Sequence, residues 1–90
     1  MEIQNKVFIV TGGASGLGEG TARMLAANGA TVVIADMQEE KGQIVANDIN
    51  GAFIKCDVRN EVDGKAAVQQ AIALGKFMSL VNCAGIAPAE

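Results

Sequence analysis

The chain has 90 residues, half of them apolar and only three aromatic, and its net charge is −3. This length suffices for one small domain but not for two. The negative charge gives no electrostatic basis for binding nucleic acid or a membrane surface, and no apolar run reaches the 18 residues of a membrane span. Cys56 and Cys83 form no C-x-x-C pair and the chain has no His, so we expect two reduced, buried thiols and no metal site.

The first expected element is a buried strand over about residues 7–11, which runs into the glycine-rich segment Thr11-Gly12-Gly13-Ala14-Ser15-Gly16-Leu17-Gly18. A helix over about 17–28 follows, closed by Asn28 and Gly29. A strand that turns through glycines into a helix gathers backbone N–H groups and the positive end of the helix dipole at one place. The segment therefore predicts a phosphate or pyrophosphate site.

The glycine spacing excludes two common phosphate motifs. A G-x-G-x-x-G motif fails because Thr21 stands where its last glycine is required, and a P-loop fails because Glu19-Gly20 replaces Lys-Ser/Thr. The pattern that remains is T-G-x-x-x-G-x-G, on Thr11, Gly12, Gly16 and Gly18.

The next strand is expected over about 31–36, and it ends on an acid, Asp36. An acid about 20 residues after the glycine turn is placed to accept hydrogen bonds from an adenosine ribose. Its carboxylate would repel the 2′-phosphate of NADP, and neither Ser15 nor Met37 supplies a cation to offset that charge. The sequence therefore favours NAD over NADP.

The rest of the chain continues the alternation of strands and helices. We expect helices near 38–48 and 61–74 and strands near 52–56 and 78–82, with Asn60 as the N-cap of the last helix. This alternation predicts a single α/β domain over residues 1–90, in which a parallel sheet carries helices on both faces.

With these features the chain resembles the short-chain dehydrogenase/reductase family. The glycine segment, Asp36, Cys56-Asp57-Val58 and Asn82-Cys83-Ala84-Gly85 carry the resemblance, although the family more often has a second Asn at the position of Cys83. It implies the amino-terminal part of a three-layer Rossmann-type sheet of strand order 3-2-1-4. The sequence of residues 82–87 looks most like that of the type 2 3-hydroxyacyl-CoA dehydrogenases, also described as 17β-hydroxysteroid dehydrogenases.

The resemblance also implies the cofactor contacts. Asp57 would contact the adenine amino group with help from the backbone of Val58, and residues 82–85 would line the nicotinamide ribose. The residues expected to bind NAD are Thr11, Gly12, Ser15, Gly16, Leu17, Gly18, Asp36, Met37, Cys56, Asp57, Val58, Asn82, Cys83, Ala84 and Gly85. The carboxyl ends of four parallel strands would then form one continuous site.

The residues that would carry the family's chemistry are missing from this chain. The family uses a Tyr to exchange a proton with the substrate oxygen, a Lys four residues later to lower the pKa of that Tyr, and a Ser to position the carbonyl. The chain has no Tyr, and no Ser follows Ser79. The resemblance implies that these residues follow Glu90, so we expect the cofactor-binding part of an NAD-dependent dehydrogenase with no catalytic residues of its own.

Two alternatives stay open on the residues alone. The chain could be a dinucleotide-binding module without catalysis, or an interaction protein that pairs through the edge of its last strand, where Leu80 and Val81 lie. That edge leads us to expect self-association or pairing with another chain. Because Met1 to Lys6 lead directly into the first strand, we expect no transit segment and a cytoplasmic location, with the mitochondrial matrix as the alternative that the resemblance implies. NAD(H) is the expected small-molecule partner.

Overall fold

The computed structural model describes residues 4–14, 16–57 and 60–82. Strands and helices alternate as expected, in the order β1 Lys6–Thr11, α1 Gly16–Ala27, β2 Thr31–Asp36, α2 Glu39–Asp48, β3 Ala52–Lys55, α3 Glu61–Leu74 and β4 Lys76–Asn82. The largest difference from the sequence prediction is the start of β4, which begins two residues early. There β4 pairs with β1 from Lys6 and Lys76 onward, and the register shifts after Val7 to accommodate one extra residue in β4.

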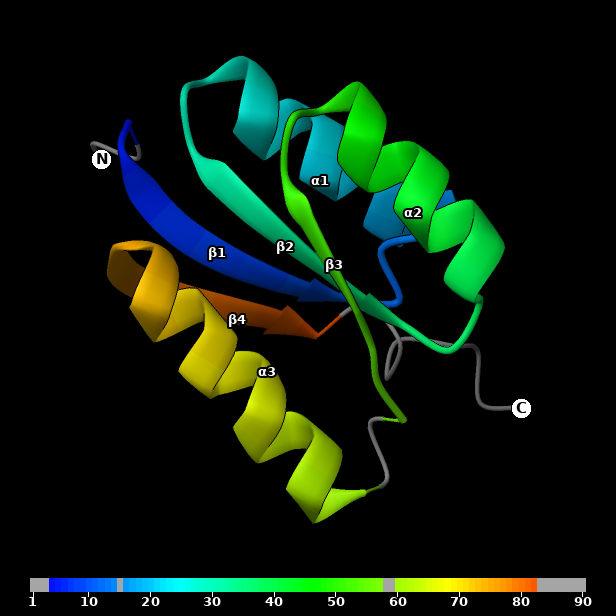
Figure 1. Ribbon diagram of the computed structural model, residues 1–90. Coiled ribbons are helices and arrows are strands. Elements are labelled where there is room, and N and C mark those ends of the chain that lie inside the picture. Colours follow the sequence, from blue (N-terminus) through cyan, green and yellow to red (C-terminus); the bar gives the residue numbers. More distant parts are fainter. Residues whose placement is uncertain (1–3, 15, 58–59, 83–90) are drawn as a thin grey trace.

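The four strands form one parallel sheet in the order β3-β2-β1-β4, which confirms the expected order. Helices α1 and α2 cover one face of this sheet and α3 covers the other (Figure 1). The three-layer α/β architecture is therefore confirmed. Within the part of the chain that the structure describes, no helix is long and apolar enough to cross a membrane.

The two central strands are buried on both faces because helices cover both. Alternate side chains of β1 and β2 enter two separate cores. The core under α1 and α2 contains Phe8, Val10, Val32 and Ile34 with Ala22, Leu25, Val45 and Ala46. The core under α3 contains Val7, Ile9, Val33 and Ala35 with Cys56, Ala67 and Ala71. This packing explains why the sequences of β1 and β2 are continuous apolar runs and not alternating ones.

Parallel pairing brings the carboxyl ends of the strands to one edge of the sheet. Thr11 at the end of β1 lies opposite Ala35 of β2 on one side and Asn82 of β4 on the other. Asp36 at the end of β2 lies opposite Lys55 of β3. Thr11, Asp36 and Asn82, which the sequence singled out, therefore lie along this edge although they are far apart in the chain.

Candidate functional site

The glycine turn after β1 depends on backbone that only glycine accommodates easily. Gly12 and Gly16 have φ angles of 69° and 61°, in the left-handed region. At Gly18, in the first turn of α1, a Cβ atom would lie 2.0 Å from the carbonyl oxygen of Gly12. The helix thus starts in direct contact with the turn, and Gly18 is required for packing inside the protein.

Gly16 differs from Gly18, because a Cβ built on it would meet nothing within 4 Å. The outer side of the turn is therefore open at the point where α1 begins. The first N–H groups of an α-helix have no partner within the helix and carry the positive end of its dipole. Leu17, the next residue, is 64% exposed on this helix start. The geometry suits the close approach of an anionic group to the backbone.

Asp36 joins the end of β2 to the glycine turn. Its side chain is nearly buried, with 8% of the residue exposed, and its Oδ2 accepts a hydrogen bond of 3.0 Å from the backbone N–H of Ala14. Its Oδ1 accepts one of 2.9 Å from the N–H of Gln38. The N–H of Gly12 donates to the carbonyl of Ala35 at 2.8 Å, which makes a second link between the two segments.

The two bonds to Asp36 leave capacity for a ligand. An ionised carboxylate has about four acceptor sites, and two of them receive backbone N–H groups here. The remaining sites can accept the two hydroxyl protons of a ribose. The sequence predicted that Asp36 binds a ribose, but it did not predict the bond between Asp36 and Ala14. No local pattern indicates this bond, because 22 residues separate the two.

The end of β3 is fixed beside Asp36. The N–H of Cys56 donates to the carbonyl oxygen of Asp36 at 3.0 Å, and Asp57 follows directly, half-buried. The Cys56 side chain itself is 3% exposed and packs in the core under α3. Burial raises the pKa of its thiol above the ordinary 9.0, and the nearby carboxylates of Asp63 and Asp57 raise it further. Cys56 is therefore a neutral core residue whose main chain borders the site.

One residue of this region was not among the sequence-predicted contacts. Asp63, in the first turn of α3, accepts a hydrogen bond of 3.0 Å from the N–H of Asp57 through its Oδ2. Its only signal in the sequence is its place three residues after the N-cap Asn60.

The other predicted site residues divide into those the structure places and those outside the described ranges. Thr11 donates from Oγ1 to the carbonyl of Val81 at 3.3 Å, so its hydroxyl ties β1 to β4. Met37 is exposed beside Asp36. The backbone of Asn82 ends β4 opposite Thr11. Ser15, Val58, Cys83, Ala84 and Gly85 lie outside the described residues.

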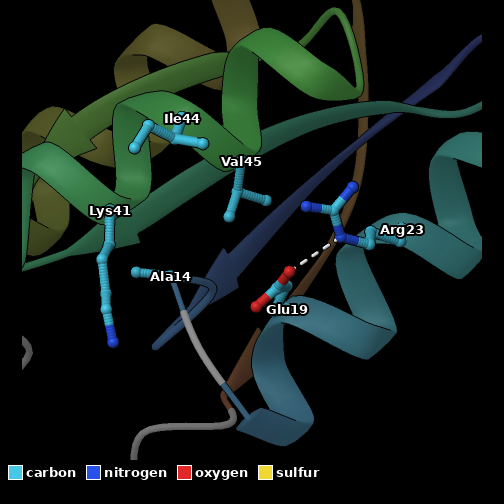
Figure 2. A pocket seen from close by; sticks show the side chains of 6 residues that line it. All are labelled: Ala14, Glu19, Arg23, Lys41, Ile44 and Val45. Atoms are coloured by element: carbon cyan, nitrogen blue, oxygen red, sulfur yellow. Dashed lines mark hydrogen bonds and ion pairs between the residues drawn. The ribbon is translucent and has the colours of Figure 1, made fainter.

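A groove of about 170 Å³ opens between α1 and α2, beside the glycine turn. Figure 2 shows Glu19 and Arg23 of α1 on one side of the groove and Lys41, Ile44 and Val45 of α2 on the other, with Ala14 between Lys41 and Glu19. Arg23 Nε lies 2.8 Å from Glu19, and its Nη2 lies 3.2 Å from Asp48, which links the two helices on the surface. These contacts raise the pKa of Arg23. The groove is smaller than the roughly 300 Å³ or more of typical ligand pockets.

Residues 6–90 match the model of the short chain dehydrogenase family, and the chain belongs to this family. It is 47% identical over 90 residues to the 3-hydroxyacyl-CoA dehydrogenase type-2 of Drosophila melanogaster, covering 97% of this chain and 35% of the relative. It is 42% identical over 88 residues to a mitochondrial borneol dehydrogenase of Lavandula x intermedia, covering 97% and 34%. The chain thus spans about a third of the length of the curated relatives that it matches.

Solved structures agree with this assignment. The 3-hydroxyacyl-CoA dehydrogenase type-2 of Mycobacterium avium superposes with a TM-score of 0.83 at 40% identity, over 88% of this chain and 32% of that one. A 3-ketoacyl-(acyl-carrier-protein) reductase of Brucella melitensis, solved in complex with NADH, superposes with a TM-score of 0.81 at 37% identity, over 87% and 33%.

Proposed function

We propose that this chain is the NAD-binding part of a short-chain dehydrogenase, which transfers hydride between NAD and a secondary alcohol or ketone. The observation that carries the proposal is the position of Asp36. Its nearly buried carboxylate lies at the end of β2 and is hydrogen bonded to Ala14 of the glycine turn. A ribose acceptor and an anion-binding turn are thereby held together at one edge of the sheet.

The residues of this edge fit the successive parts of a dinucleotide. The backbone around Gly12, Gly16 and Gly18 would hold the pyrophosphate, since the turn is open at Gly16. Asp36 would bind the adenosine ribose, and Asp57, fixed beside it, would take the adenine amino group. Residues 82–85 would line the nicotinamide ribose. The bound nicotinamide supplies the hydride chemistry, while these residues bind and orient it.

The charge of Asp36 supports selectivity for NAD. The repulsion between the carboxylate and a unit negative charge 4 Å away is about 1 kcal/mol in water and about 4 kcal/mol at an effective dielectric of about 20. A 2′-phosphate brings more than one charge to that place. We therefore expect NADH to bind at least about tenfold more tightly than NADPH, because each 1.4 kcal/mol is a factor of ten.

The substrate class we propose, a 3-hydroxyacyl-CoA, comes from the relatives. Over this segment the chain is 47% identical to the Drosophila 3-hydroxyacyl-CoA dehydrogenase, but also 42% to borneol dehydrogenase and 45% to the (-)-isopiperitenol/(-)-carveol dehydrogenase of Mentha piperita. Similar identity to enzymes named for different alcohols favours a segment that serves the shared cofactor. Substrate choice then depends on the two thirds of the relatives that this chain does not match.

Calorimetric titration of the chain with NADH and NADPH tests the proposal. The wild type should prefer NADH, and Asp36→Asn, which keeps the shape and removes the charge, should lose most of that preference. Glu40→Gln is the matched control, because Glu40 is an exposed acid in the first turn of α2. It removes the same charge four residues away and should leave the preference unchanged.

The cofactor binding of Asp36→Asn can be compared with that of the wild type only if the variant is folded. Ala14 and Gln38 donate to different oxygens of Asp36, so in Asp36→Asn the amide NH2 group faces one of these donors, and the substitution should also cost roughly 1–3 kcal/mol in stability. Circular dichroism and a urea melt under the titration conditions separate this loss from a loss of binding. A folded wild-type chain that binds neither dinucleotide, or that prefers NADPH, would contradict the proposal.

A further inference from the structure

The N-cap residue and the first turn of α3 together hold both main-chain groups of Asp57. The N–H of Asp57 donates to Oδ2 of Asp63 at 3.0 Å, and its carbonyl oxygen accepts from the N–H of Asn60 at 2.8 Å. Asp63 is only partly exposed. The position of the Asp57 peptide groups is thus set by α3, six residues further along the chain.

This arrangement differs from the usual capping of a helix start. Asn60 acts as an ordinary N-cap, since its Oδ1 accepts from the N–H groups of Val62 and Asp63 at 2.9 and 3.3 Å. In a capping box, the acid three residues later would return to the N–H of the cap residue. Here that N–H already donates to Asp57. The Asp63 carboxylate instead reaches past the cap to the residue that follows β3 and Cys56.

A third bond fixes the other side of the same turn. The N–H of Cys56 donates to the carbonyl of Asp36 at 3.0 Å. Cys56 is therefore tied to the end of β2, while Asp57, the next residue, is tied to α3. Because a main-chain bond fixes Cys56 to Asp36 and the Asp63 side chain holds the N–H of Asp57, a displaced Asp63 oxygen would move Asp57 relative to Asp36.

We propose that Asp63 is a positioning residue, which holds the backbone of Asp57 so that the Asp57 carboxylate meets the 6-amino group of adenine. The inference rests on the proposed function, in which Asp57 takes that amino group. A purely stabilising role, in which the negative charge of Asp63 favours the start of α3 through the helix dipole, makes a different prediction. It requires the charge, whereas positioning requires an acceptor oxygen at the right place.

Three variants separate charge from position. Asp63→Asn removes the charge and keeps an oxygen at the same reach. Asp63→Glu keeps the charge and moves the oxygen by one methylene group. Asp63→Ala removes both, and Asp63→Glu keeps the test decisive if the alanine variant does not fold. Glu40→Ala, an exposed acid in the first turn of α2, controls for the loss of charge at a helix start.

The readout is the preference of the chain for NADH over reduced nicotinamide hypoxanthine dinucleotide, in which an oxygen replaces the 6-amino group. A hydrogen bond from that amino group to a carboxylate should give the wild type about a tenfold preference. Asp63→Asn and Glu40→Ala should retain it. Asp63→Glu and Asp63→Ala should reduce it to about twofold or less, since a displaced Asp57 no longer meets the amino group.

Hydrogen exchange measures the tether without any cofactor. The amide of Asp57 should be protected in the wild type and in Asp63→Asn, and should exchange at least about tenfold faster in Asp63→Ala. Unchanged protection at Asp57 in the alanine variant would overturn the inference.

The outcomes distinguish this inference from the proposed function. A wild type that prefers NADH over NADPH but does not discriminate the two purines keeps the NAD site and overturns the role of Asp63. That role is likewise overturned if Asp63→Glu retains the full purine preference, or if Asp63→Asn loses it. A wild type that binds no dinucleotide contradicts the proposed function, and this inference fails with it.

Discussion

The turns after β1 and after β3 lie at the same edge of the sheet but are held by different means. In the first, backbone packs against backbone, since Gly18 of α1 lies directly against the carbonyl of Gly12, and the Asp36 carboxylate adds a bond to Ala14. The second is fixed by side chains, because Asn60 caps α3 and Asp63 receives the N–H of Asp57. The first therefore has no room for an added atom at Gly18, whereas the second depends on the reach of the Asn60 and Asp63 side chains.

The strands that carry these turns differ in the same sense. Five of the six residues of β1 are buried, as are five of six in β2. The four residues of β3, at the edge of the sheet, are at most half-buried. A site built across these strands therefore combines a part held by the buried strands β1 and β2 with a part, at the end of β3, that α3 has to support. Substitutions in the two turns and in the residues that hold them test this difference.

The largest effect is expected at Gly18. In Gly18→Ala the Cβ would lie 2.0 Å from the Gly12 oxygen, which is main chain and cannot rotate away. We expect a loss of at least about 3 kcal/mol in the free energy of unfolding and the loss of NADH binding. Urea unfolding followed by circular dichroism, with calorimetry for the cofactor, measures both.

Gly20→Ala is the matched control on the same helix, because a Cβ at Gly20 meets nothing within 4 Å. It should raise stability by about 0.5–1 kcal/mol, since alanine is the better helix former. Equal destabilisation by the two substitutions would show that the contact with Gly12 does not hold the turn.

A smaller effect is expected at Asn60, which supports the second turn. Asn60→Ala removes the acceptor for the N–H groups of Val62 and Asp63 and should cost about 1 kcal/mol. Asn60→Ser, which restores an N-cap oxygen, should recover most of it. The measurement is again urea unfolding. A loss as large as that of Gly18→Ala would remove the contrast between the two turns.

The smallest effect concerns Cys56, whose thiol pKa is raised above 9.0 by burial and by Asp63 and Asp57. In a Cys83→Ala background, alkylation of Cys56 by iodoacetamide at pH 8 should be slow and should accelerate in urea. Because the folded thiol keeps its proton to higher pH than the unfolded one, the free energy of unfolding should fall as the pH rises above about 9. Alkylation that is equally fast in the folded and unfolded chain would contradict this environment for Cys56.

Local patterns determined most of the fold. The apolar runs of β1 and β2, the glycines after β1 and the caps at Asn28-Gly29 and Asn60 each act within a few residues, so the sequence alone predicts the elements and their order along the chain. The early start of β4 was not predictable from its own residues. It follows from pairing with β1, which begins at Lys6 and imposes a register shift on its neighbour.

The site shows the same division. The residue types of the glycine turn, Asp36 and Asp57 were enough to predict a dinucleotide site, because each type matches one part of such a ligand and the spacing fits one βαβ unit. Only the tertiary structure decided that Asp36 also holds Ala14, that Cys56 turns into the core and that Asp63 holds Asp57. These contacts depend on the distance and direction between elements after packing, and neither quantity is encoded in a local stretch of sequence.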